Sequence, residues 1–421
     1  MRRQEHDGPP AAVSFQVGVN YWPRTRAMYW WDEFVAAEVE DDFARLAACG
    51  FAVVRLFLLW EAFQPSPDRV SAEALRHLEQ TMDIAQRHDL RVMPTLFCGH
   101  MSGANWLPAW MLMPGSARGR FPVVCQGRVR RAIPRNPYTE PGVREAQRLL
   151  CQAVAERLNG HPALEGYDLG NEASNWACPP SREAAREWLQ VMVSELKRPA
   201  PGAPVTLGMH AEDLEEDRGL WPQDAALFCD YLCMHGYPFY LTWVHDPLDV
   251  LVLPFLGALT RWLGGKPVLF QEFGIHSRPV IPPDDGEELA AAKVPAFSEA
   301  QGLEYYRRAW RLLWEEGMRG AYAWCYGDYV PSLWQRVPLS DSPHERHFGL
   351  FRHDGSAKPA AATPGEFLSG VDTVRQTPPA PRDDWVRGED PSAFYGAPRE
   401  NLVRLYQRYR QARPDPNSRQ G

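Results

Sequence analysis

The sequence lacks the features that mark membrane, nucleic-acid-binding and secreted proteins. Its 421 residues contain no apolar run of about 18 residues, the length that crosses a bilayer. No block of Lys and Arg interleaves with aromatic residues, and 45 basic against 53 acidic side chains give a formal net charge of −8. No apolar segment of a signal peptide follows the N-terminal MRRQEHDGPP. We therefore expect a cytoplasmic protein with no membrane or nucleic-acid partner.

Motifs for metals and cofactors are also missing. The eight cysteines form no CxxC pair, which favours reduced thiols over a disulfide framework or a zinc site. His344 and His347 lack a third ligand at a suitable spacing. The sequence contains no Gly-rich phosphate loop, no Gly-x-Ser-x-Gly elbow and no Cys/His protease signature. Neither a metal nor another cofactor is predicted.

Aromatic residues, in contrast, are abundant: they make up 12% of the chain and include 16 Trp. Trp and Tyr are amphipathic and often line ligand clefts, and a sugar site would use them. A large core also holds many aromatic residues, so no single Trp decides between these interpretations. Together with the absent basic patch, the composition favours a neutral small-molecule partner.

Eight short apolar segments alternate with amphipathic helical segments, such as those at 37–48, 74–88, 144–158 and 304–316. Segments this apolar on both faces indicate a buried parallel sheet, and eight of them predict an α/β fold of the (β/α)8 TIM-barrel type. The predicted strands lie at 15–22, 53–60, 92–99, 164–171, 204–210, 231–237, 267–274 and 320–327.

The barrel is expected to occupy residues 13–364. Residues 365–421 then form a C-terminal extension made of a Pro-rich linker, a docked helix at 398–410 and a disordered tail. Between predicted strands three and four, residues 101–141 are expected to form a long structureless loop that carries Trp106, Trp110, Arg118 and Arg120. Because C-terminal loops build the active site of such barrels, this loop could convert a cleft into a pocket.

Two glutamates follow predicted strands at the end where barrel enzymes hold their catalytic groups. Glu172 ends the segment DLGNE after strand four, and Glu272 lies in FQEFG at the end of strand seven. Two carboxylates across a barrel mouth suggest glycoside hydrolysis with retention. One carboxylic acid protonates the leaving oxygen, and burial and its partner's charge would keep it protonated; the second, ionised carboxylate attacks the anomeric carbon.

With these two glutamates, the chain resembles the clan A glycoside hydrolases, in particular the family-five cellulase, mannanase and β-mannosidase type. The hallmark is Asn-Glu at the end of strand four and Glu at the end of strand seven. The likeness covers about residues 13–364 and includes GVNYW at 18–22, VRL at 54–56, His235-x-Tyr237, Trp324, FGLF at 348–351 and DGSAKP at 354–359.

The resemblance implies that Glu172 is the acid/base and Glu272 the nucleophile, while Asn171 bonds the sugar 2-hydroxyl. It further implies that two residues, Arg55 and Tyr237, keep the nucleophile ionised and aimed. The residues themselves add some support. A buried cation such as Arg55, within the apolar VVRLFLLW, needs an acidic partner, although a carboxylate on a helix would also serve.

The remaining candidate site residues have weaker support. By the resemblance, His235 supports the acid/base or the sugar, and Trp324 forms the floor of the −1 subsite. The spacing of His235 and Tyr237 places both on one face of their strand. A purely structural role is the alternative for His235, Tyr237 and Trp324. Three further candidates have the same alternative: His100 and His210, which could contact the sugar, and Trp176, which could form a +1 platform.

The substrate is less certain than the reaction. We expect a retaining β-glycoside hydrolase that removes terminal sugars from short β-linked oligosaccharides, similar to β-mannosidases. An endo-β-1,4-mannanase or endoglucanase is the alternative, and a non-catalytic carbohydrate-binding barrel is a second one. The sequence does not decide the sugar epimer, the linkage, the oligomeric state or the role of Cys98 and Cys325.

Overall fold

The computed structural model describes residues 14–113, 115, 119–279, 294–371 and 377–413. Eight parallel strands form one sheet in the order β11-β10-β3-β2-β1-β14-β13-β12. An isolated parallel bridge between His210 and His235 joins the two edges, so the sheet closes into a barrel. The strands are β1 (Gln16–Asn20), β2 (Val53–Leu59), β3 (Arg91–Cys98), β10 (Tyr167–Asn171), β11 (Val205–Gly208), β12 (Leu232–His235), β13 (Val268–Phe273) and β14 (Gly320–Ala323).

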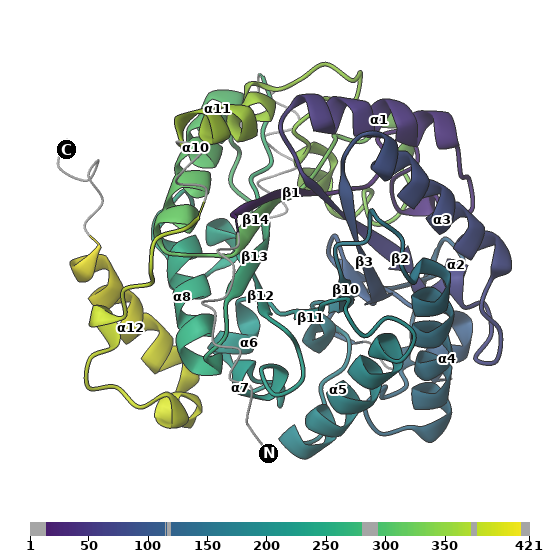
Figure 1. Ribbon diagram of the computed structural model, residues 1–421, viewed down its shortest axis with the longest axis horizontal. Coiled ribbons are helices and arrows are strands. Elements are labelled where there is room, and N and C mark those ends of the chain that lie inside the picture. Colours follow the sequence, from purple (N-terminus) through teal and green to yellow (C-terminus); the bar gives the residue numbers. More distant parts are fainter. Residues whose placement is uncertain (1–13, 114, 116–118, 280–293, 372–376, 414–421) are drawn as a thin grey trace, which may run out of the picture.

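Helices surround this barrel (Figure 1). The longer ones are α1 (Ala36–Ala48), α3 (Ala72–Arg87), α4 (Pro141–Leu158), α5 (Arg182–Lys197), α8 (Val252–Gly264), α10 (Glu299–Glu315), α11 (Thr363–Gly370) and α12 (Pro398–Ala412). Shorter ones are α2 (Trp60–Phe63), α6 (Glu212–Glu215) and α7 (Pro222–Ala225). The predicted (β/α)8 fold is confirmed, and each of the eight predicted strands overlaps a barrel strand.

Local sequence explains where several helices begin. The Ser71 side chain accepts a hydrogen bond from the Ala74 amide at 3.2 Å and so caps α3. At α10 the cap is Ser298, which forms a reciprocal capping box with Gln301. Such caps satisfy amide groups that have no partner inside the helix, and they therefore set its first residue.

The segment 101–141 is not the structureless loop that the sequence suggested. Its described part contains β4 (His100–Met101), β5 (Ala104–Trp106), β7 (Val123–Cys125) and β8 (Arg128–Arg130) in one small sheet, with β6 (Leu112–Met113) paired to β9 (Ile133–Pro134). Each of the two hairpins, β4–β5 and β7–β8, has a two-residue turn in which both residues have a positive φ. The turns are Ser102-Gly103 and Gln126-Gly127. These short turn signals were overlooked because the flanking strands have only two or three residues. Arg118 lies outside the described residues.

Near the C-terminus, α12 packs on α8. Ten of the 13 residues of α8 are buried, which is expected of a helix that is apolar around its whole circumference. The Phe255 ring of α8 lies 5.0 Å from that of Tyr406 and 5.5 Å from that of Tyr409. Figure 1 shows α12 alongside α8, outside the ring of barrel helices. The expected tail after 413 lies outside the described residues.

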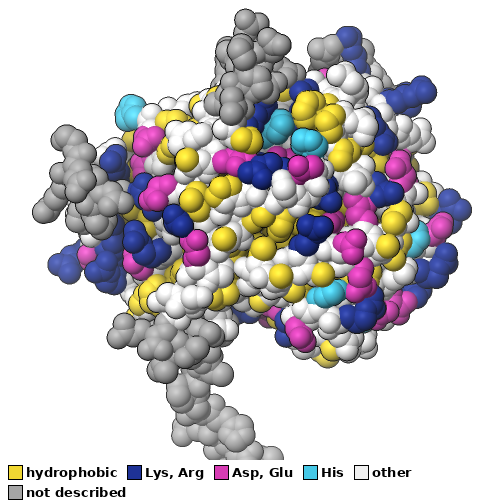
Figure 2. Space-filling model, turned by 90° about the horizontal axis from the view of Figure 1, so that it is seen from above, with side chains coloured by type: hydrophobic (Ala, Val, Ile, Leu, Met, Phe, Trp, Pro, Cys, Tyr) yellow, Lys and Arg dark blue, Asp and Glu magenta, His cyan; other side chains and the backbone are white. Residues whose placement is uncertain are grey.

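The visible surface carries charges of both signs. On the face shown in Figure 2, basic and acidic side chains are interspersed with apolar ones and do not gather into a single basic patch. Within the described ranges, no helix combines the length and the apolar composition that a membrane span requires.

Candidate active site

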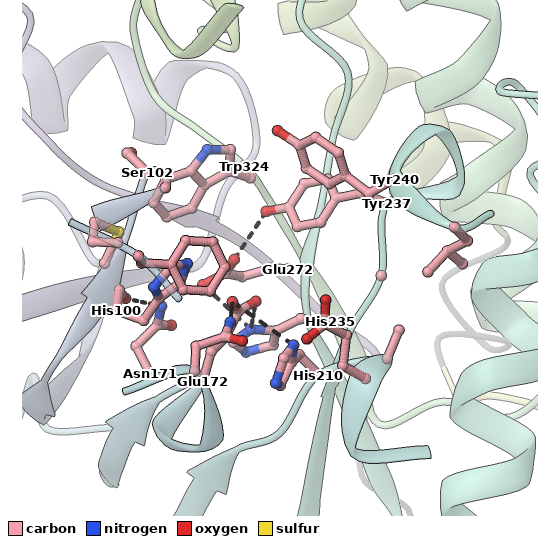
Figure 3. Close-up of a pocket in the computed structure, with 18 of the residues that line it drawn as sticks. His100, Ser102, Asn171, Glu172, His210, His235, Tyr237, Tyr240, Glu272 and Trp324 are labelled. Carbon is pink, nitrogen blue, oxygen red and sulfur yellow. Dashed lines mark hydrogen bonds and ion pairs between the residues drawn. The ribbon is translucent and has the colours of Figure 1, made fainter. Parts of the chain in front are cut away.

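A cavity of about 540 Å³ opens at the C-terminal ends of the barrel strands. This is the end at which barrel enzymes carry their active sites. The ends of six barrel strands, β3, β10, β11, β12, β13 and β14, contribute to its wall, and Figure 3 shows the side chains converging. Among the predicted site residues, those that line it are His100, Asn171, Glu172, His210, His235, Tyr237, Glu272 and Trp324.

Arg55 lies directly beneath this cavity, in the middle of β2, and is fully buried. Its Nη1 donates to Asn20 Oδ1 at 3.0 Å and to the carboxylate of Glu272. Its Nη2 donates to Asp168 Oδ2 at 2.7 Å and to Asn171 Oδ1 at 2.8 Å. Burial alone would lower the pKa of Arg55, but the neighbouring carboxylates raise it. The guanidinium therefore stays charged and fixes these four side chains at once.

Glu272 receives hydrogen bonds on both carboxylate oxygens. Arg55 donates to Oε1, and the Tyr237 hydroxyl donates to Oε2 at 2.9 Å (Figure 3). His235 Nδ1 is 3.6 Å from Oε1. Donors on every side stabilise an ionised carboxylate and hold it in one orientation. This is the environment that a nucleophile in glycoside hydrolysis needs. Both residues expected to hold Glu272, Arg55 and Tyr237, contact it, whereas His235 was expected beside the acid/base or the sugar.

A buried chain of polar side chains sets the state of His235. Asp168 Oδ2 accepts a hydrogen bond from Gln271 Nε2 at 3.2 Å, which orients the amide so that Gln271 Oε1 faces His235 Nε2 at 3.0 Å. His235 Nδ1 faces Glu172 Oε1 at 3.1 Å. Both ring nitrogens thus face acceptors, the arrangement that suits an imidazolium. Burial disfavours this cation, but the charge of Glu272 and the bond to Glu172 raise the pKa of His235.

Glu172 differs from expectation in its electrostatics. Burial favours the neutral acid, yet the neighbouring His210, His235 and His100 lower its pKa. The sequence analysis expected burial and the second carboxylate to keep Glu172 protonated; it did not anticipate three imidazoles around one carboxylate. Within the Glu172–His235 pair, the lowered pKa of Glu172 and the raised pKa of His235 both favour the proton on His235.

The backbone at Glu172 is also unusual. Its φ is 48°, in the left-handed region that a residue with a side chain rarely adopts. The register between β10 and β11 shifts between Asp168 and Asn171, just before this residue. Such irregularities re-aim side chains at the end of a strand. Here the Glu172 carboxylate enters the cavity, where Asn175 Nδ2 donates to its Oε2 at 3.1 Å.

The two histidines predicted as sugar contacts occupy opposite sides of the acid/base. His100 Nδ1 pairs with Asn105 Oδ1 at 2.8 Å, and its ring lies 4.3 Å from that of Phe121. Burial lowers the pKa of His100, so its neutral form is favoured. His210 Nε2 faces the Ser174 hydroxyl at 2.9 Å, and its Nδ1 is 3.9 Å from the Glu172 carboxylate. Both imidazoles present an edge to the cavity.

The two candidate tryptophans have different fates. Trp324 follows β14, lines the cavity and stands edge-on to Phe57 at 5.7 Å. Trp176 lies outside this cavity: its ring packs edge-on against Trp60 at 5.9 Å and fills the space above Gly99. Only a glycine fits under that indole, since a Cβ at position 99 would lie 2.1 Å from its Nε1. Trp176 instead lines a neighbouring hollow that shares Arg120 and Asn175 with the cavity, so its role as a +1 platform stays a prediction.

Other cavity residues were missed by the sequence analysis. They come from loops whose proximity depends on the folded barrel, so the sequence offered no local signal for them. The hairpin region contributes Ser102, Arg120 and Phe121, and α6 contributes Glu212. The segments after β12 and β14 contribute Tyr240, His344, Glu345 and Phe348, and α12 contributes Arg399. Asp168 and Gln271, which organise the site from below, were recognisable only as polar residues inside apolar strands.

Two further features bear on alternative chemistry. One atom each of Glu172, His235 and Glu272 could form a metal-binding triad, since these atoms lie within 4.8 Å of one another. However, the Arg55 guanidinium and the raised pKa of His235 already supply positive charge there, which disfavours a cation. Near the barrel mouth, burial raises the pKa of the Cys98 and Cys325 thiols, so both are packed residues and not nucleophiles.

Comparison with known proteins matches this geometry. A family model described as beta-galactosidase, glycoside hydrolase family 42, matches residues 28–200. The resemblance to the clan A glycoside hydrolases is confirmed. Mannan endo-1,4-beta-mannosidase A of Hypocrea jecorina is 22% identical over 293 residues. The match covers 62% of this chain and 61% of that protein, and a second curated relative is covered to 57%.

Solved clan A structures share the fold over most of the chain. A GH5_18 protein from Streptomyces cattleya, solved with GlcNAc, is 24% identical with a TM-score of 0.72; 88% of this chain and 83% of that one are covered. An exo-beta-1,4-mannosidase from Opitutaceae bacterium strain TAV5 is 25% identical with a TM-score of 0.67, covering 86% and 60%. A GH5_18 structure from Bifidobacterium longum contains Manβ1-4GlcNAc and has a TM-score of 0.70 at 20% identity over 87% and 80%.

Proposed function

We propose that the protein is a retaining exo-β-glycosidase of the β-mannosidase type, acting on short β-linked oligosaccharides. The observation that carries this proposal is the spacing of the two glutamates, whose carboxylate oxygens approach within 4.8 Å. Carboxyl groups in retaining enzymes stand about 5–5.5 Å apart, whereas inverting enzymes leave about 6.5–9.5 Å for a water molecule. The separation favours direct attack by a carboxylate.

In the first half of the reaction, the ionised Glu272 attacks the anomeric carbon. A bond forms between its carboxylate oxygen and C1 while the bond from C1 to the leaving oxygen breaks. That oxygen takes a proton from Glu172, which receives it from His235 through the 3.1 Å contact. Arg55 and Tyr237 hold the nucleophile in position.

In the second half, water replaces the leaving group. Glu172, now a carboxylate, removes a proton from the water as the water oxygen attacks C1 and the bond to Glu272 breaks. The carboxylate form of Glu172 suits this base role, and the proton that it takes returns to His235, whose raised pKa suits storage of the proton between turnovers. One pair thus supports both directions of proton transfer.

The walls of the cavity support removal of terminal sugars. The Ser102-Gly103 turn reaches the segment after β14, where a Cβ at Gly103 would lie 3.1 Å from Ser342 Oγ. Both segments line the cavity, and we infer that together they wall it on the side away from Glu172. On the Glu172 side, the cavity shares Arg120, Asn175 and Glu216 with a neighbouring hollow. The leaving group, which must lie beside the acid, therefore has room to extend, whereas the glycone does not.

Several relatives support the choice of mannose. The relatives include mannan endo-beta-mannosidases and an exo-beta-1,4-mannosidase, and a structural neighbour contains Manβ1-4GlcNAc. Because these relatives include mannan endo-beta-mannosidases, endo cleavage is the alternative. We also propose a reducing compartment such as the cytoplasm, because all eight cysteines are free.

The test is nitrophenol release from aryl β-mannoside, glucoside, galactoside, xyloside, cellobioside and mannobioside, with Glu272→Ala as the blank. We expect turnover of the mannoside. Turnover of the disaccharide glycosides alone would instead support an endo-enzyme, and silence across the panel would favour a binding-only barrel. Stereochemistry of the first-formed sugar, followed by NMR, should show the β-anomer; the α-anomer would overturn retention.

A further inference from the structure

Glu345 is a buried acid in the cavity wall to which the proposed chemistry gives no role. It lies in the 3-10 helix Pro343–His347, in the segment that follows β14, and is 8% exposed. Its neighbours along the wall include Ser102, Tyr240 and Phe348. No motif in the sequence singled it out, because its position depends on how this segment folds over the barrel mouth.

The Glu345 carboxylate has weak partners for a buried charge. Among the described residues, the Tyr240 hydroxyl lies 3.5 Å from its Oε1, and His344 Nε2 lies 3.7 Å away. Tyr240 is more closely engaged with His344, at 2.6 Å. Burial and Arg278 lower the pKa of His344 to about 4, so this imidazole is neutral at pH 7 and supplies no counter-charge. Buried carboxylates normally have several close donors, so this one has unused acceptor capacity.

The electrostatics place Glu345 close to both catalytic carboxylates. Burial, followed by the charges of Glu272 and Glu172, raises its pKa to about 7, and the nearby Ser102 hydroxyl partly offsets this rise. A sugar bound with C1 between the two catalytic groups would therefore lie within reach of Glu345. Sugar hydroxyls are the donors that the carboxylate lacks in the empty cavity.

The position of Glu345 also decides which sugar edge it can meet. It is three residues from Ser342, which touches the Ser102-Gly103 turn at the closed side of the cavity. With C1 at Glu272 and the leaving group directed past Glu172, the opposite ring edge faces this closed side. In a pyranose that edge is C3–C4–C5, which carries the 3- and 4-hydroxyls and the 6-hydroxymethyl group, and the 4-hydroxyl is where a 1,4-linked chain would continue.

We propose that Glu345 is a specificity-determining residue that accepts hydrogen bonds from the 4- and 6-hydroxyls of the terminal sugar. This proposal rests on the proposed function and deepens it, since it assigns recognition of the non-reducing end to one carboxylate. A sugar substituted at the 4-position loses its donor hydroxyl and meets the closed wall. Glu345 therefore selects chain ends.

The test is a cycle of enzyme and substrate changes. Values of kcat/KM are measured for aryl β-mannoside and its 4-deoxy and 6-deoxy analogues with the wild type, Glu345→Gln and Glu345→Ala. The measurements are made above pH 7, where Glu345 is ionised. A hydrogen bond to a charged group contributes about 10- to 100-fold, so we expect such a loss when either partner is removed. For the contacted hydroxyl, removing both should cost little more than removing one.

Two controls separate recognition from folding. Glu195→Gln changes another buried glutamate, on α5, which pairs with Arg148 far from the cavity. The Glu195→Gln variant should discriminate between the parent and deoxy substrates as the wild type does, even if the unfolding midpoint of this variant falls. All variants are compared by thermal unfolding. If the Glu345→Ala variant fails to fold, Glu345→Gln still provides the test because it preserves the side-chain volume.

The outcomes distinguish this proposal from the proposed function. If the wild type turns over another monosaccharide glycoside, the same cycle is run with that sugar and the same pattern supports the role of Glu345. If deoxygenation and the Glu345 substitutions lower kcat/KM by independent, multiplying factors, Glu345 does not contact these hydroxyls and the proposal is overturned alone. Absence of turnover by the wild type contradicts the proposed function and this proposal together.

Discussion

The two ends of the barrel interior differ in chemistry although the same strands build both. Near the N-terminal ends of the strands, the interior holds a mainly apolar cluster of Val53, Met93, Tyr231, Cys233, Leu269 and Tyr322. One layer higher, Arg55, Asp168 and Gln271 form a buried polar network. The lower layer can only contribute to stability through packing, whereas the upper layer holds charges at defined positions. Function is thus separated from stability along the axis of the barrel.

The largest expected effect comes from removing the nucleophile in the upper layer. Glu272→Ala should lose about 10³-fold or more in kcat, because no other group can form the glycosyl ester. Its unfolding midpoint should stay near that of the wild type, since the substitution also removes a buried charge. Activity assays and thermal unfolding check both points. Full activity in this variant would refute the assignment.

Removing the acid/base should have a smaller effect that depends on the leaving group. Glu172→Ala should lower kcat/KM by about 10²- to 10⁴-fold with poor leaving groups, the range of general acid catalysis. Activated aryl glycosides need less protonation, so the loss should be smaller with them. Added azide should then accelerate turnover by entering the vacated face. A loss that is equal for all leaving groups, with no azide effect, would contradict the acid/base role.

A third prediction concerns the network that holds the proton. The pKa of His235 is raised in the folded protein, so its proton is retained to higher pH. Gln271→Leu removes the acceptor of the Nε2 proton and should lower this pKa. The basic limb of the kcat/KM profile should consequently move to lower pH, while the acidic limb changes less. An unchanged basic limb would show that His235 does not store the catalytic proton.

The smallest effect on turnover is expected in the lower layer. Leu269→Ala should reduce the free energy of unfolding by about 2–5 kcal/mol, the usual cost of a cavity in a core. The rate per folded molecule should remain close to that of the wild type. Denaturant unfolding and active-site titration measure the two quantities separately. A large loss of rate in the folded fraction would show that the two layers are coupled.

The sequence predicted the barrel well because its signal is local. Each apolar strand and each amphipathic helix carries its own periodicity, so the eight barrel strands could be located directly. The two candidate catalytic glutamates, Glu172 and Glu272, could be picked out because carboxylates at the ends of apolar strands have no other local reason to be there, and the structure brings both into one cavity. Their spacing of 4.8 Å or less required the closed barrel.

What sequence reasoning missed depends on contacts between distant segments. Trp176 was expected beside the sugar, but its ring packs over the bare backbone of Gly99 and lines the hollow next to the cavity. Glu345 could not be predicted as a cavity residue, because the segment that carries it lies over the cavity only in the closed barrel. The charge state of Glu172 also depends on three histidines from three different strands. None of these relations has a period or a motif.

The most direct test of the central claim is to trap the covalent intermediate. A 2-deoxy-2-fluoro-β-mannosyl fluoride should transfer its sugar to the nucleophile, with fluoride as the leaving group, and should accumulate as an ester because the 2-fluoro group slows hydrolysis. We expect mass spectrometry of the digested protein to place the label on Glu272. A label on another residue, or steady turnover to the α-anomer without any label, would contradict the account.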